Sequence, residues 1–492
     1  MIRVYMHDLK AQELNQLFLS GEIKAKEVAR YFLQRAHAAN SFLGCFLEIF
    51  DQQVLEKAEL LDKKKELGLP LSPLACVPFS VKDNIHIKDK KTTCASRSLA
   101  HFIAPFTASC VKFLEEADAL CIGKTNLDEC AMGSSTETSA FQKTHNPWNL
   151  AYSPGGSSGG AAASLASRSV LFALGSDTGG STRQPAAYNN VLGFKPSRGF
   201  FSRFGLAPMA CSLDEIAPMA LCSSDMAIIC NHLSRPCYLD PFYTQREKPL
   251  KPQIEGSLKA KTLGVPWDFL KNLHPYVLKA FQESLSIFTS LGAQIVAIDL
   301  KNLEYSLPIY QILSCIEAYS HLAKIDGITF SSSVSSSTST WDSTIQSRSE
   351  GFGQEVKQRL LLGAHLLNIE SEKKYHEKAL RGQKIIRKIF HEAFQDCSLI
   401  ALPTTSSKAF KLGALQDPLH MYLQDLFTIS ANLTGLPALS IPMGFCHEHL
   451  PLGLQLIGQE QKEQELFLFS HLFETKTKFI HQIPPLFNKK VL

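Results

Sequence analysis

The segment SPGGSSGGAAASLASRSVLFALGSDTGGS, residues 153–181, is the most distinctive stretch of the sequence. Two clusters of glycine, serine and threonine, at 153–160 and 175–181, flank a run of small residues at 161–166 and an apolar run at 170–174. The small residues are typical of a close-packed helix, and the apolar run predicts a buried strand. The two clusters are therefore expected in loops beside a helix and a strand, as in an α/β fold.

The two glycine clusters allow four interpretations. Tight structural turns are the simplest. Residues 155–159 also fit the G-x-S-x-G elbow of α/β-hydrolases, but an elbow follows an apolar strand and this stretch follows the polar loop 145–152. A phosphate-binding loop is a third possibility, although the lysine of a P-loop is absent. In the fourth, Ser181 is a nucleophile, and an oxyanion is held by the backbone N–H groups of Thr178, Gly179, Gly180 and Ser181.

A serine nucleophile needs a base that takes its proton. The 16 histidines are scattered, and none lies in a segment as distinctive as the glycine clusters. Lys82 follows the apolar run 76–81. A lysine held in a dry site loses its proton more easily and can act as a base. A lone lysine is more often exposed to solvent, and from the residues alone we favour exposure for Lys82.

Short apolar runs alternate with helical periodicity along the rest of the chain. The first 66 residues have apolar residues at three- and four-residue spacing, with a break at Gly21. Further on, strands are expected at 76–81, 119–123, 399–402, 438–443 and 452–457, and helices at 109–117, 422–433 and 463–473. The fold class that follows is α/β, with a large mixed β-sheet covered by helices on both faces and a helical N-terminal segment.

The composition excludes several classes of protein. Charged residues make up 20% of the 492 residues and apolar residues 45%, which is typical of a globular protein. The formal net charge of +4 does not indicate a nucleic-acid-binding surface. The 13 cysteines include no Cys-x-x-Cys pair, so we expect reduced thiols and no metal site. Without a signal peptide or a membrane-spanning apolar run, the expected location is the cytoplasm.

The distinctive residues resemble the amidase signature family. The resemblance rests on Lys82 in VKDNI, Ser157 in SPGGSSGG and Ser181 in LGSDTGGSTRQPAA. The intervals between these three residues are 75 and 24 positions, the same as in family members. The resemblance implies that Lys82 is the ultimate base, that Ser157 lies on a cis peptide bond and relays the proton, and that Ser181 attacks the amide carbon.

Nearly the whole chain resembles the amidase subunits of tRNA-dependent amidotransferases, in stretches such as LDECAMGSSTETSAF, SRSEGFGQEVKQRLLLG and LPLGLQLIG. The resemblance implies a glutaminase that supplies ammonia for converting Glu-tRNA(Gln) to Gln-tRNA(Gln). The expected complex is a heterotrimeric ligase of protein biosynthesis with B and C subunits. ATP and Mg²⁺ are expected at a partner subunit, tRNA mainly on the B subunit, and no cofactor in this chain. Glutamine is expected to contact Tyr310, Arg359 and Asp425.

The resemblance also predicts the organisation of the chain as a single amidase domain over 1–492. Its expected parts are a helical N-terminal segment (1–66), a catalytic core (67–230), a helix-rich substrate-pocket and partner region (231–395) and a C-terminal part of the core (396–492). A flexible serine-rich loop is expected at 328–342.

Three stretches depart from the family pattern: ITFSSSVSSSTST after Asp326-Gly327, Tyr188-Asn189-Asn190 and Ser197-Arg198-Gly199-Phe200. They motivate an alternative function, a stand-alone amidase of another small amide. A non-catalytic assembly subunit is the alternative from another class.

Overall fold

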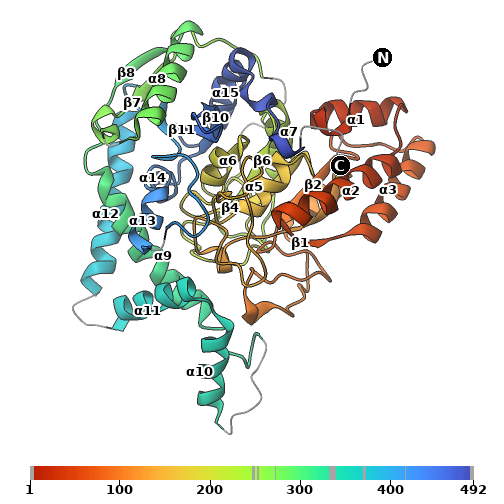
Figure 1. The fold of residues 1–492 in the computed structure, drawn as a ribbon. Helices are drawn as coiled ribbons and strands as arrows, with labels where there is room; N and C mark the ends of the chain where they lie inside the picture. The colour runs from red at the N-terminus through yellow and green to blue at the C-terminus, as the bar shows by residue number, and fades with distance from the viewer. Residues whose placement is uncertain are drawn as a thin grey trace.

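The computed structural model describes residues 5–245, 250–251, 254–271, 273–331, 339–368, 373–415 and 417–487 (Figure 1). In these residues eleven strands form one mixed sheet in the order β1-β3-β2-β4-β6-β5-β10-β11-β9-β7-β8. The strands are β1 Phe46–Ile49, β2 Pro78–Lys82, β3 Leu120–Thr125, β4 Phe172–Asp177, β5 Leu192–Lys195, β6 Glu215–Ala220, β7 Thr262–Val265, β8 Gln294–Ala297, β9 Leu399–Pro403, β10 Ala438–Phe445 and β11 Pro451–Gly458.

Fifteen α-helices in the same described ranges surround the sheet. They are α1 Ala11–Ser20, α2 Ala25–Leu43, α3 Asp51–Glu66, α4 Ser109–Glu116, α5 Gly159–Ala166, α6 Arg183–Asn189, α7 Ser223–Leu233, α8 Pro275–Ser290, α9 Ser306–Leu322, α10 Thr340–Gly351, α11 Gln354–Asn368, α12 Lys373–Ala393, α13 Pro418–Tyr422, α14 Ile429–Thr434 and α15 Glu463–Thr477. None of the helices in the described part of the chain is long and apolar enough to span a membrane.

Parallel pairing of β2 with β3 and β4 brings the ends of three strands to one edge of the sheet. Every residue of β2 and β4 is buried, as expected of strands covered on both faces. Val81 pairs with Leu174, so the lysine that ends β2 lies beside the last residues of β4. The loops after these two strands therefore start next to each other.

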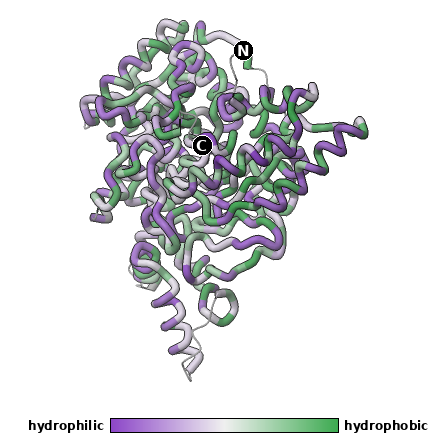
Figure 2. Tube along the Cα trace, turned by 45° about the vertical axis from the view of Figure 1, so that its right-hand side comes forward, coloured by the Kyte–Doolittle hydropathy of each residue, from purple (hydrophilic) through white to green (hydrophobic). Residues whose placement is uncertain are grey.

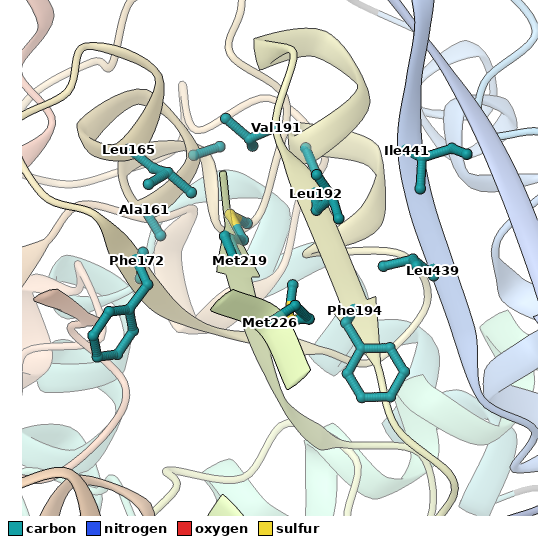
Figure 3. Close-up of a cluster of buried hydrophobic side chains, with 14 of the residues drawn as sticks. Ala161, Leu165, Phe172, Val191, Leu192, Phe194, Met219, Met226, Leu439 and Ile441 are labelled. Carbon is teal, nitrogen blue, oxygen red and sulfur yellow. The ribbon is translucent and has the colours of Figure 1, made fainter. Parts of the chain in front are cut away.

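The two faces of the sheet are covered by different helices. On β11 a Cβ at Gly453 would lie 2.4 Å from Ala187 Cβ of α6, and a Cβ at Gly458 would lie 3.3 Å from Leu466 of α15. Positions 453 and 458 point to opposite faces because side chains alternate along a strand. Figure 3 shows the core between these layers, where Leu165 of α5 and Met226 of α7 lie around the strands that carry Leu192 and Leu439.

The outer helices are amphipathic. On α2 the buried face includes Val28, Phe32, Leu33 and Ala36, which recur at the spacing of one helix face. Figure 2 shows hydrophilic and hydrophobic residues alternating along the outer helices. Helix α10 extends away from the body of the molecule at the bottom of Figure 1.

The predicted fold class is confirmed, and so are the strands expected at 76–81, 119–123, 399–402, 438–443 and 452–457, within two residues at each end. Five strands were missed: β1, β5, β6, β7 and β8. The N-terminal segment 1–66 is not entirely helical, because Phe46–Ile49 pairs with β3 at the edge of the sheet. The serine-rich loop expected at 328–342 lies partly outside the described residues (332–338), and it ends earlier than expected because α10 begins at Thr340.

Close packing of α6 on β11 gives a test of the sheet's architecture. Gly453→Ala places a Cβ 2.4 Å from Ala187 Cβ and 2.9 Å from Ala187 Cα, so strand and helix must separate. We expect the free energy of unfolding to fall by about 1–3 kcal/mol, as for other overpacked cores. Gly458→Ala on the same strand is the control, because its nearest neighbours lie at 3.3–3.5 Å. Urea denaturation compares the two, and equal losses of stability would contradict the predicted difference.

Candidate active site

Lys82 ends strand β2 with its side chain completely buried. Its Nζ donates hydrogen bonds to three serine hydroxyls: Ser157 Oγ at 2.7 Å, Ser158 Oγ at 2.8 Å and Ser176 Oγ at 3.0 Å. Burial lowers the pKa of Lys82 from 10.5 to about 7, although nearby carboxylates, led by Asp128, oppose the shift. Hydroxyls can accept from either form of the amine, so Lys82 can be neutral near pH ~7.

The three hydroxyls around Lys82 differ in where they can send a proton. Ser158 Oγ donates to the carbonyl oxygen of Ser176 at 3.1 Å, so its proton is already engaged. Ser176 Oγ also accepts from Asn84 Nδ2 at 3.0 Å. Neither the Ser157 nor the Ser176 hydroxyl donates to an acceptor among the described residues. Of these two, Ser157 is the one in the loop that the Ser158 N–H joins to the Ser181 carbonyl.

Ser157 follows a cis peptide bond with Gly156, in a loop that has no space for a side chain at position 156. A Cβ there would lie 2.0 Å from Asp128 Oδ2 and 2.5 Å from the backbone nitrogen of Ser135. The Gly156 N–H donates to Gln184 Oε1 at 2.9 Å, and the Ser157 carbonyl accepts from the Asp128 N–H at 3.3 Å. Only glycine fits at position 156.

Asp128 organises this loop, and sequence reasoning did not single it out. Its buried carboxylate accepts from the backbone N–H of Thr136 at 2.8 Å and of Ser135 at 3.1 Å, and from Thr138 Oγ1 at 2.9 Å. Burial raises the pKa of Asp128, while these hydrogen bonds favour the ionised form. An aspartate shortly before the Ser/Thr-rich stretch 134–139 was the available signal.

Asp177 holds the second glycine loop. Its carboxylate forms a fully buried ion pair with Arg183, with Nη2 to Oδ1 at 2.9 Å and Nε to Oδ2 at 3.0 Å. It also accepts from the backbone N–H groups of Gly180 at 3.0 Å and Thr182 at 3.2 Å. Burial alone would raise the pKa of Asp177, but Arg183 and Asn432 outweigh it and lower the pKa to about 2.

The glycines of this loop allow two close contacts. A Cβ at Gly179 would lie 2.7 Å from Tyr310 Cζ, and a Cβ at Gly180, where φ is +132°, would lie 2.1 Å from Thr428 Oγ1. Thr428 Oγ1 donates to the Gly179 carbonyl at 2.6 Å. The backbone of the second glycine loop (175–181) therefore packs directly against α9 and the segment before α14.

Ser181 lies at the end of this loop and is half-buried, while Lys82 and Ser157 are buried. Its carbonyl accepts from the Ser158 N–H at 3.0 Å, which joins the two glycine-rich loops. No hydrogen bond between the Ser157 and Ser181 hydroxyls is present among the described residues. Of the four predicted oxyanion donors, Gly180 has its N–H engaged by Asp177. The N–H groups of Thr178, Gly179 and Ser181 have no acceptor in the part of the chain that the structure describes.

Tyr310, Arg359 and Asp425 lie together beside the second glycine loop. The Tyr310 ring covers Gly179, and the charges of Arg359 and Asp425 both act on it. Arg359 Nε donates to Glu355 Oε1 at 2.7 Å, and its guanidinium lies 5.2 Å from the Tyr422 ring centroid.

Asp425 accepts from Ser134 Oγ through Oδ2, while its Oδ1 is shielded from solvent without a partner in the described residues. Burial raises the pKa of Asp425 to about 7, and the Ser134 hydrogen bond and Arg359 limit the shift.

One of the atypical stretches supports the Ser157 loop. Asn189 Nδ2 donates to the Pro154 carbonyl and to the Pro185 carbonyl, both at 2.7 Å. Tyr188 OH donates to Gln424 Oε1 at 3.1 Å. The departure at Tyr188-Asn189-Asn190 therefore lies behind the glycine-rich loop and fixes its position.

Side chains that could hold a metal do not gather anywhere in the described ranges, where no group of three or more His, Cys, Asp or Glu side chains has the required proximity. The thirteen cysteines all lie in the described residues, where no disulfide joins them, and all except Cys121 and Cys211 are buried.

The chain is an amidase, and in it a buried lysine bonded to serine hydroxyls lies next to a glycine-lined loop at the edge of a mixed sheet. The chain belongs to the amidase family, because residues 27–467 match the family described as Amidase.

Two relatives match this chain over nearly its whole length. The A subunit of glutamyl-tRNA(Gln) amidotransferase from Protochlamydia amoebophila (strain UWE25) is 42% identical over 482 residues, covering 98% of this chain and 99% of that protein. The protein of the same name from Chlamydia pneumoniae is 41% identical over 488 residues, with 99% and 98% covered.

A solved structure also matches this chain over nearly its whole length. The crystal structure of the A subunit of glutamyl-tRNA(Gln) amidotransferase from Thermotoga maritima has a TM-score of 0.82 and 32% identity, covering 98% of this chain and 99% of that one. A bacterial aryl acylamidase of the amidase signature family has a TM-score of 0.85 at 21% identity, with 97% and 98% covered, which shows the fold alone.

The ion pair between Asp177 and Arg183 gives a test of how the second glycine loop is held. Asp177→Asn leaves Arg183 charged and unpaired in the core, so we expect the free energy of unfolding to fall by about 3–5 kcal/mol. Because the pKa of Asp177 is lowered from 3.8 to about 2, the difference should persist above pH ~4 and disappear as the pH falls toward ~2.

Urea denaturation at several pH values measures this difference. Glu377→Gln is the matched control, since it removes an exposed partner of Arg381 at 3.3 Å and should have little effect. Equal effects of the two substitutions would show that the buried pair does not hold the loop.

Proposed function

We propose that this chain is the glutaminase component, known as the A subunit, of a tRNA-dependent amidotransferase, and that it uses Lys82, Ser157 and Ser181 as a catalytic triad. The observation that carries the proposal is the completely buried Lys82 amine, 2.7 Å from Ser157 Oγ and beside the loop of Ser181. The high identity to two such A subunits over nearly the full length supports the same assignment.

In the proposed reaction, neutral Lys82 takes a proton from Ser157 as Ser157 takes one from Ser181. Ser181 Oγ then attacks the side-chain amide carbon of glutamine. The carbonyl oxygen becomes an oxyanion, and the free N–H groups of Thr178, Gly179 and Ser181 are its candidate donors. One such donor typically contributes about 2.7–4 kcal/mol to the transition state. Gly180 is better described as a link between the loop and Asp177 than as a donor.

Collapse of the tetrahedral intermediate breaks the carbon–nitrogen bond. The proton that Lys82 holds returns through Ser157 to the leaving nitrogen, so ammonia departs and an ester remains on Ser181. Water then attacks the ester, and the same relay takes its proton. Glutamate is released and the three residues regain their starting protonation states.

The charges beside Ser181 suit an amino acid substrate. Arg359 has donors left for the α-carboxylate after its Nε bond to Glu355, and Asp425 has the unpartnered Oδ1 for the α-ammonium. Tyr310 lies between them and the nucleophile loop. A stand-alone amidase of neutral amides would have no use for this pair of opposite charges.

The other parts of the proposal concern the complex. We propose that the chain works in the cytoplasm in a heterotrimer with B and C subunits. The charged tRNA would lie mainly on the B subunit, and ATP and Mg²⁺ at a partner subunit. The relatives named as A subunits support an amidotransferase complex, whose other subunits would use the ammonia released here.

A serine substitution in the assembled complex tests the catalytic triad and the glutaminase function together. Ser181→Ala should lower glutamine-dependent formation of Gln-tRNA(Gln) by at least about 10⁴-fold, because it removes the nucleophile. The same variant should still form Gln-tRNA(Gln) from ammonium chloride, because ammonia replaces the missing product. Glutamine hydrolysis and tRNA amidation are measured in parallel.

Ser158→Ala is the matched control for this experiment. Ser158 also accepts from Lys82, at 2.8 Å, but its proton is bonded to the Ser176 carbonyl, so we expect a much smaller loss. Glutamine hydrolysis that survives Ser181→Ala would contradict the triad. Turnover of simple amides by the isolated chain, with no tRNA amidation in the complex, would favour the stand-alone amidase.

The pH dependence separates two groups whose pKa is about 7. Lys82 must be neutral to act as a base and Asp425 ionised to bind an ammonium, so both become competent as the pH rises through ~7. For glutamine, log(kcat/KM) plotted against pH should therefore rise below pH ~7 with a slope of two, one for each ionisation. For glutaramate, which lacks the α-amino group, the slope should be one.

Asp425→Asn should weaken glutamine use far more than glutaramate use and leave the glutaramate profile unchanged. A rate with glutaramate that does not change as the pH passes through ~7 would contradict the role of Lys82 as a base.

A further inference from the structure

A cleft of about 590 Å³ lies away from the catalytic serines, between the atypical stretch Ser197–Phe200 and helix α12. We call it the arginine cleft; its lining includes Arg198, Phe242, Arg387, His391, Phe394 and Glu460. None of Lys82, Ser157 and Ser181 lines it. Helices α12 and α14, which form one side, pack against each other (Figure 1). Its volume is in the range of small-molecule sites.

The two arginines meet at Gly435, which ends α14 with a φ of +77°. A Cβ at position 435 would lie 3.3 Å from Arg198 Cβ, 3.9 Å from Arg198 Cδ and 3.8 Å from Arg387 Nη2. The backbone N–H of Arg198 donates to the Gly435 carbonyl at 2.9 Å. The backbone thus brings two side chains of the same charge to one point of the cleft.

Most hydrogen-bond donors of the two guanidinium groups are unused within the described residues. Arg387 donates there only through Nε, to the Thr434 carbonyl at 3.3 Å. The Arg198 guanidinium lies 5.0 Å from the Phe242 ring centroid and makes no hydrogen bond or ion pair in the same ranges. A guanidinium has five N–H donors in a planar fork that matches phosphate and carboxylate oxygens.

The surrounding charges leave the cleft basic. Burial lowers the pKa of Arg198, with further lowering by Arg203 and Arg387, while Glu215 and Glu317 oppose the shift. Glu460 is the carboxylate in the lining. Neither arginine has a carboxylate within ion-pair distance in the part of the chain described. An anion placed between them would relieve the repulsion of two converging cations.

We infer that the arginine cleft binds the phosphate group of a small anionic molecule of about nucleotide size. Arg198 and Arg387 would hold the phosphate oxygens, and the rings of Phe242 and Phe394 would contact the rest of the molecule. Phosphate is favoured over carboxylate because two converging guanidinium groups suit a dianion with three free oxygens. The site goes beyond the proposed glutaminase function and would remain even if that function were wrong.

Isothermal titration calorimetry of the full chain with inorganic phosphate, AMP and adenosine tests the inference. We expect saturable binding of phosphate and tighter binding of AMP, and no binding of adenosine, which has no phosphate. Arg198→Gln and Arg387→Gln should each weaken AMP binding by about five- to tenfold, the effect of losing charge-assisted hydrogen bonds at a partly exposed site.

Arg381→Gln is the matched control, because Arg381 lies on α12 six residues before Arg387 and pairs with Glu377 outside the cleft. AMP binding should be unchanged in this variant. Thermal unfolding checks that each variant folds. Arg387→Gln decides the outcome if Arg198→Gln does not fold, since Arg387 is exposed and loses a single 3.3 Å bond.

Three results would overturn the inference: no saturable binding of either phosphate or AMP, equal affinity for AMP and adenosine, or AMP binding that both cleft variants leave unchanged. A further titration with tRNA distinguishes the source of the phosphate. Binding of tRNA that depends on Arg198 and Arg387, without competition from AMP, would assign the cleft to a nucleic-acid backbone and contradict a small-molecule site.

Discussion

The buried amine of Lys82 is the group on which the rest of the site depends. A charged ammonium in a fully buried position is costly, and this cost lowers the pKa of Lys82 to about 7. The contacts of Nζ are hydroxyls, which accept a hydrogen bond without fixing a positive charge. Asp128, Asp177 and Asp214 act on Lys82 from beyond hydrogen-bond contact. A carboxylate in direct contact would hold the proton on the lysine, so the distance of the three aspartates keeps the pKa of Lys82 low.

The glycines of the two loops also keep Lys82 buried, because they allow the backbone to pack closely around the site. Gly156 lies against Asp128, Gly179 against Tyr310 and Gly180 against Thr428, and a Cβ at any of these positions would lie within 2.7 Å of its neighbour. Larger residues would separate the loops, admit water and raise the pKa of Lys82 toward its usual value. The small residues therefore serve the electrostatics of the lysine as well as the shape of the backbone.

The sequence predicted the parts of the fold that have a local pattern. Strand β9 and the first half of β4 lie in apolar runs, and the loops after β2 and β4 contain the distinctive glycine and serine residues. Strands β5, β7 and β8 have only four residues each, and β6 contains both Glu215 and Pro218, so neither length nor apolar pattern identified them. Asp128 and Asp177 were missed as organising residues because their roles depend on how the loops turn. The loops direct backbone N–H groups toward each carboxylate, and Asp177 also pairs with Arg183.

The pairing of Asp177 with Arg183 explains how the Asp177 carboxylate can lie next to the place where an oxyanion is expected to form. An aspartate near an oxyanion would normally repel it. Here Arg183 pairs with the carboxylate in a fully buried ion pair, so the local net charge is close to zero. The Asp177 carboxylate accepts hydrogen bonds from the backbone N–H groups of Gly180 and Thr182. The N–H groups of Thr178, Gly179 and Ser181 make no such bond within the described residues, so the turn that Asp177 fixes leaves donors available to an oxyanion.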